Sequence, residues 1–68
     1  MTNAELMNEE EKFLTAPQLD MLELIESCWM NGKKNNTLSV KASVMAGRIA
    51  SKAPKISERL MELSKALV

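Results

Sequence analysis

The sequence predicts a small all-α bundle of three or four helices that is assembled as a dimer. A helix-capping signal at Thr15 precedes a long apolar stretch, and apolar residues near the C-terminus recur every three or four positions. No segment shows the alternation of polar and apolar residues that is typical of a strand. The dimer follows from size, because 68 residues bury only a small core and usually need added stabilisation.

Residues 1–14 are predicted to be an acidic N-terminal arm or a short helix. Asn3 can cap such a helix, and glutamates follow in its early turns, where the helix dipole favours negative charge. The apolar face of this segment is patchy. We therefore place the helical domain itself at residues 15–68.

The first helix of this domain is predicted over residues 16–31. Thr15 and Gln18 have the spacing of a capping box, and Pro17 lies in the first turn, where its missing N–H is tolerated. Gly32 is suited to end the helix. The apolar residues of this helix are Leu19, Met21, Leu22, Leu24, Ile25, Cys28, Trp29 and Met30.

A polar turn over residues 33–37 leads into a segment with two interpretations. Residues 38–40 are either a brief extended link or the first turn of a short helix over residues 40–47. This helix is rich in small residues, which allow close approach of a second helix. We expect Gly47 to end it, unless tertiary packing carries it on to Ile49.

Ser51 is the predicted N-cap of the last helix, with Pro54 at its third position. Spacings of three and four residues give this helix one apolar side, which we interpret as core, with a dimer seam as the alternative. The residues of this stripe are Ala53, Ile56, Leu60, Leu63 and Leu67.

The net charge is zero, but the two signs are separated along the chain. Residues 1–32 carry seven carboxylates and one lysine, whereas residues 33–59 carry seven lysines and arginines and one carboxylate. Such asymmetry indicates a surface that binds a polyanion. Alternatively, the acidic half neutralises the basic half across a dimer.

A long helix, a turn, a short helix and a final helix with basic opening turns make up the layout of a helix-turn-helix domain. Over residues 19–68 the chain resembles a winged-helix domain of the bacterial MarR type. LDMLELI (19–25) resembles its leucine-rich helix, LSV (38–40) its short extended segment, ISERLMEL (56–63) its recognition helix, and ALV (66–68) the exit into the wing. The sequence ends where the β-hairpin wing would begin, and Arg48 follows Gly47 where simple motifs favour an apolar residue.

The leading functional prediction is a small transcriptional regulator that binds DNA as a homodimer, because the resemblance implies a recognition helix in the major groove. Lys52, Lys55 and Arg59 share one face of the last helix. The residues predicted to contact DNA are Lys41, Arg48, Lys52, Lys55, Ser57 and Arg59.

The alternative is a helical protein of phage or plasmid type that binds and inhibits a host regulatory protein without touching DNA. An apolar face on the first helix that is wider than a small core needs, together with the acidic arm, favours this interpretation. The residues predicted to form a protein interface are Met21, Leu24, Ile25, Trp29, Leu63 and Leu67.

We expect no enzyme, cofactor, metal or small-molecule substrate. The chain has no histidine, and its one cysteine, Cys28, is expected to be an inert buried thiol. No apolar run approaches the ~20 residues of a membrane span, and residues 1–11 are acidic, unlike a secretory leader. The sequence therefore predicts a cytoplasmic protein.

Overall fold

The computed structural model describes residues 8–68, which form an all-α bundle as the sequence predicts. A short 3-10 helix at Glu11–Phe13 precedes three α-helices, α2 (Ala16–Met30), α3 (Asn36–Ile49) and α4 (Pro54–Ala66). These described residues contain no strand. The prediction of a helix beginning near Asn3 concerns residues that lie mostly outside the described part of the chain.

Local sequence determines the bounds of α2, and the predicted helix is confirmed. The Thr15 hydroxyl accepts a hydrogen bond from the backbone N–H of Gln18 (3.3 Å), and the Gln18 side chain accepts one from the backbone N–H of Thr15 (3.0 Å). At the other end Gly32 has a φ of 71°, a conformation that glycine adopts without strain. Both ends are therefore fixed by residues within one turn of them.

Helix α3 begins earlier than the sequence predicts, and of the alternatives left open the structure confirms helical residues 38–40 and continuation to Ile49. The Asn35 side chain accepts a hydrogen bond from the backbone N–H of Leu38 (3.0 Å), so the helix begins at Asn36 and residues 38–40 are helical, not extended. The helix also continues through Gly47, although glycine costs a helix about 1 kcal/mol relative to alanine. Packing carries it onward, because Ile49 in its last turn is fully buried.

Helix α4 begins at Pro54, and its capping group comes from the other end of the chain. The expected N-cap, Ser51, is replaced by Ala53, whose side chain makes no capping bond. Instead, the Glu10 carboxylate accepts hydrogen bonds from the backbone N–H groups of Lys55 (3.1 Å) and Ile56 (2.8 Å). A carboxylate at this position satisfies two free donors and complements the positive end of the helix dipole.

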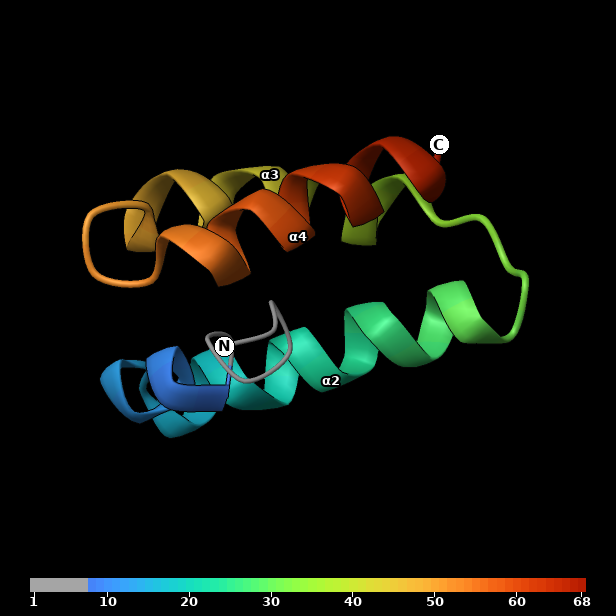
Figure 1. The fold of residues 1–68 in the computed structure, drawn as a ribbon. Helices are drawn as coiled ribbons and strands as arrows, with labels where there is room; N and C mark the ends of the chain where they lie inside the picture. Colours follow the sequence, from blue (N-terminus) through green and yellow to red (C-terminus); the bar gives the residue numbers. More distant parts are fainter. Residues whose placement is uncertain (1–7) are drawn as a thin grey trace.

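Helices α3 and α4 form an antiparallel hairpin along their whole length (Figure 1). At one end Asn35 N–H donates to the Leu67 carbonyl (2.8 Å), and near the other Ser57 Oγ donates to the Ala46 carbonyl (2.8 Å). Between them Ser39 Oγ donates to the Ser64 carbonyl (2.6 Å). Helices of a helix-turn-helix cross at about 90–120° instead. The hairpin therefore gives the resemblance to MarR-type domains no support.

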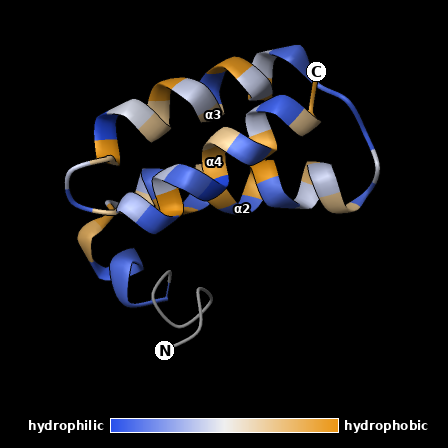
Figure 2. Cartoon of the chain, turned by 45° about the horizontal axis from the view of Figure 1, so that its top comes forward, coloured by the Kyte–Doolittle hydropathy of each residue, from blue (hydrophilic) through white to orange (hydrophobic). Residues whose placement is uncertain are grey.

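The hydrophobic core lies between the hairpin and α2, and polar and apolar segments alternate along each helix (Figure 2). The apolar stripe of α4 is entirely buried, which confirms its interpretation as core. The prediction that Ile25, Leu63 and Leu67 form a protein interface is wrong, because each is at most 1% exposed within a single chain. Their side chains pack in the hydrophobic core that joins α2, α3 and α4.

We predict that Glu10→Gln lowers the free energy of unfolding by about 1 kcal/mol, as loss of a helix cap typically does. In a domain of this size this corresponds to a fall in Tm of roughly 4–8 °C. The matched control is Glu9→Gln, because Glu9 is exposed and makes no described hydrogen bond. Thermal denaturation followed by circular dichroism measures both, and equal melting of the two variants would contradict the capping role.

Candidate protein-binding groove

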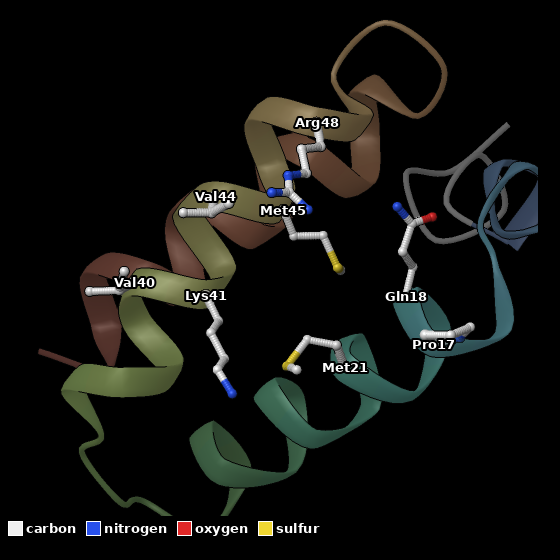
Figure 3. Close-up of a pocket in the computed structure, with 8 residues that line it drawn as sticks. All are labelled: Pro17, Gln18, Met21, Val40, Lys41, Val44, Met45 and Arg48. Carbon is white, nitrogen blue, oxygen red and sulfur yellow. The ribbon is translucent and has the colours of Figure 1, made fainter.

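A groove of about 300 Å³ lies between α2 and α3. It is open to solvent along one side and bounded by the first two turns of α2 and by the middle and end of α3 (Figure 3). The lining residues are Pro17, Gln18, Met21, Val40, Lys41, Val44, Met45 and Arg48.

The floor and walls of the groove are mostly apolar. Met21 on α2 and Met45 on α3 direct their thioether groups into the space between the helices (Figure 3). Val40 and Val44 are 63% and 50% exposed, which is unusual for valines in so small a domain. Methionine side chains are flexible and polarizable, so they adapt to partners of different shape. Leu24, 52% exposed, follows Met21 by three residues and extends the α2 side.

Two cations, Lys41 and Arg48, flank this apolar surface. They lie seven residues apart on α3, which places them two turns apart on one side of the helix, at about 10 Å along its axis. Among residues 8–68, ion pairs within 4 Å involve only Lys55 and Arg59. Helix α3 contains no acidic residue of its own. The edge of the groove is therefore positively charged.

The outward side of α3 carries no charge. Val40, Ser43, Val44 and Gly47 follow one another at spacings of three, one and three residues, and all four are exposed. Exposed helix faces of soluble proteins are usually covered with charged groups. An uncharged and partly apolar face next to a groove indicates a surface that another protein chain covers.

Arg59, which the sequence assigns to a DNA-binding face, links α4 to α2. Its guanidinium lies 3.6 Å from the Glu26 carboxylate and 3.8 Å from that of Glu62. It also stacks over the Trp29 ring at 4.9 Å from the centroid. These contacts account for the orientation of Trp29, which the sequence predicts to be an interface residue and which is 43% exposed.

The other predicted DNA contacts are dispersed over the molecule. Lys41 and Arg48 line the groove, Lys52 is exposed in the turn before α4, and Lys55 lies 3.9 Å from Glu58. Ser57 lies inside the protein, because its hydroxyl donates to a carbonyl of α3. Placing Ser57 at a DNA-facing surface was therefore wrong. Of the six residues, Lys41 and Arg48 both line the groove, and Lys55 and Arg59 lie one turn apart on α4.

The described part of the chain holds no cluster of metal-ligating side chains. No group of three histidine, cysteine, aspartate or glutamate side chains is placed to hold a metal ion among residues 8–68. Cys28 is half-buried, and its sulfur lies 3.8 Å from the Lys33 carbonyl oxygen. None of the helices described has the length and apolar character that crossing a bilayer requires.

Five of the residues that line the groove are not among those predicted from the sequence. Four of these five are apolar, and three of the four lie on α3. Val40, Ser43, Val44 and Gly47 lie within the helix predicted over residues 40–47, but the sequence does not show which side of that helix faces solvent. The missed groove residues are Pro17, Gln18, Val40, Val44 and Met45.

Comparisons of this chain with protein-family models, with curated proteins and with solved structures gave no match.

We predict that Arg59→Gln changes the fluorescence of Trp29, the only tryptophan in the chain. Loss of the stacked guanidinium exposes one face of the ring, so the emission maximum shifts to longer wavelength. The stability loss stays within about 1 kcal/mol, because the ion pairs are partly exposed. Lys65→Gln, on the exposed side of the same helix, serves as the control, and identical spectra for both variants would contradict the stacking.

Proposed function

We propose that this protein acts by binding another protein, and that the groove between α2 and α3 holds an amphipathic helix of that partner. The observation that carries the proposal is an exposed apolar surface flanked by Lys41 and Arg48, for which residues 8–68 supply no carboxylate. A protein that covers a helix of its partner blocks the other contacts of that helix. This is the action of an adaptor or antagonist.

The shape and chemistry of the groove favour a helix as the bound element. A groove between two helices receives a third through apolar residues spaced at i, i+3, i+4 and i+7. Val40 and Val44 offer one apolar wall, while Met21 and Met45 provide an adaptable floor. No unpaired sheet edge is present among residues 8–68, so addition of a strand is not supported.

The charges at the rim favour acidic residues on the bound helix. Lys41 and Arg48 are two turns apart, so carboxylates seven residues apart on a helix running beside α3 reach both. Such charges at a rim set the orientation of a partner and accelerate association more than they raise affinity. Burial of the valines then supplies most of the binding free energy.

A protein partner is better supported than DNA by the surroundings of α4. The Glu10 carboxylate occupies the N-terminal N–H groups of α4, where a phosphate would otherwise bind. Lys55 and Arg59 lie beside the carboxylates of Glu58 and Glu62. A DNA backbone approaching this helix would therefore meet carboxylates as well as cations.

The test is selection of peptides from a randomised library of helix-forming sequences displayed on phage. We expect the enriched peptides to carry apolar residues at helical spacing and carboxylates seven residues apart. Val44→Asp places a charge in the apolar wall, and we expect it to weaken binding of a selected peptide at least tenfold, or about 1.4 kcal/mol. Isothermal titration calorimetry measures the change.

Lys65→Glu is the matched control, because it alters charge on α4 away from the groove and leaves peptide affinity unchanged. Duplex DNA of random sequence is titrated in parallel at low salt. If the selected peptides bind the Val44→Asp variant with unchanged affinity, the proposal is contradicted. Salt-sensitive DNA binding without peptide enrichment would support the DNA-binding regulator in its place.

A further inference from the structure

The chain itself carries an acidic helix, although its two exposed carboxylates are three residues apart and not seven as in the helix proposed to bind the groove. Helix α2 contains Asp20, Glu23 and Glu26 and no basic residue. Glu26 faces α4, where it pairs with Arg59, but Asp20 and Glu23 are exposed. Leu24, which lies one turn after Asp20, is exposed beside them. The outer side of α2 is thus an acidic surface with an exposed leucine at its edge.

Lys41 and Arg48 line the groove from α3, whereas no acidic residue lines it from α2. Asp20 is exposed on α2 one turn after Pro17, which does line the groove. Figure 1 shows that α2 and α3 run in opposite directions. A two-fold axis that runs along the groove would place α2 of each copy against α3 of the other. Interfaces of this symmetry require such self-complementary surfaces.

We infer that a second copy of this chain covers the groove when the partner is absent, with the acidic edge of α2 in each copy against Lys41 and Arg48 of the other. This inference rests on the proposed function, because it makes self-association and partner binding mutually exclusive at one site. The partner helix then displaces α2 of the second copy.

Electrostatics selects this pairing over the alternatives. Packing α3 against α3 of the second copy would place Lys41 and Arg48 beside the Lys41 and Arg48 of that copy. Packing α2 against α2 would place the carboxylates Asp20 and Glu23 beside their counterparts in the same way. Like charges placed face to face suppress such arrangements. Only α2 on α3 brings opposite charges together at both halves of the interface.

The surface of the protein is large enough for such a dimer. A standard interface takes about 800 Å² from each partner, which is about a fifth of the 4451 Å² of accessible surface here. It would cover Leu24, Val40 and Val44, each at least half exposed in the single chain. Burial of these side chains adds apolar contacts that a 68-residue core lacks.

The test exchanges charges between the two edges. One variant combines Lys41→Glu with Arg48→Glu, and the other combines Asp20→Lys with Glu23→Lys. In analytical ultracentrifugation at low salt, we expect the unmodified protein to dimerise and each variant alone to dissociate at least tenfold more readily. An equimolar mixture of the two variants should form a heterodimer, because one half of its interface keeps the native charges and the other half is complementary with reversed signs.

Lys33→Glu combined with Lys65→Glu is the matched control, because it makes the same charge change outside the groove and should leave the dimer intact. All exchanged residues are exposed, so circular dichroism should show helical content like that of the unmodified protein. An unmodified protein that stays monomeric at millimolar concentration overturns the inference. A mixture of variants that fails to associate overturns it as well.

The two proposals fail in distinguishable ways. Peptides that bind the groove of a protein that is always monomeric would support the proposed function and overturn the dimer. If the charge-exchanged variants behave as expected but no peptide is enriched from the library, the dimer is supported and the proposed function is overturned. If both hold, a saturating selected peptide converts the dimer to a complex of one chain and one peptide.

Discussion

Close packing of α3 against α4 is the constraint on which the rest of the surface depends, because it determines which side of α3 is left for other contacts. The two helices meet through alanines and serines, and the hydroxyls of Ser39 and Ser57 donate to carbonyl groups across the interface. A larger side chain there would push the helices apart. Since its small-residue side is committed to α4, α3 directs its valines and cations toward α2 and solvent, which creates the groove.

Some of the charged residues that are separated along the sequence make contacts with one another that stabilise the bundle. Glu10 caps α4 from 45 residues away, and Glu26 on α2 pairs with Arg59 on α4. Both contacts join an acidic residue of the first half to α4, so the charge of that helix is balanced locally. Lys41 and Arg48 receive no such carboxylate among residues 8–68. The charge asymmetry thus contributes to folding at α4, and at α3 it leaves Lys41 and Arg48 for the proposed recognition of a partner.

The sequence predicts those features that short-range patterns determine. Thr15 and Gln18 cap α2 within one turn, and the apolar stripe of α4 marks its buried side, so both helices could be predicted. The long-range cap from Glu10 leaves no local pattern, and the burial that carries α3 through Gly47 depends on the hairpin. Val44 lies within the helix predicted over residues 40–47, but its exposure beside α2 depends on the tertiary packing. Lys41 and Arg48 were selected as binding residues, but only coordinates could show that they border α2.

A groove with two cations about 10 Å apart distinguishes poorly between acidic helices that present similar spacing. At physiological ionic strength charges act over about 8 Å, so Lys41 and Arg48 make two local contacts and generate no extended attractive field. A chain with no net charge also attracts a polyanion weakly from a distance. Preference for a partner helix over α2 of a second copy must then come from the apolar contacts. Val40, Val44 and the two methionines of the groove are therefore the residues that decide which helix is held.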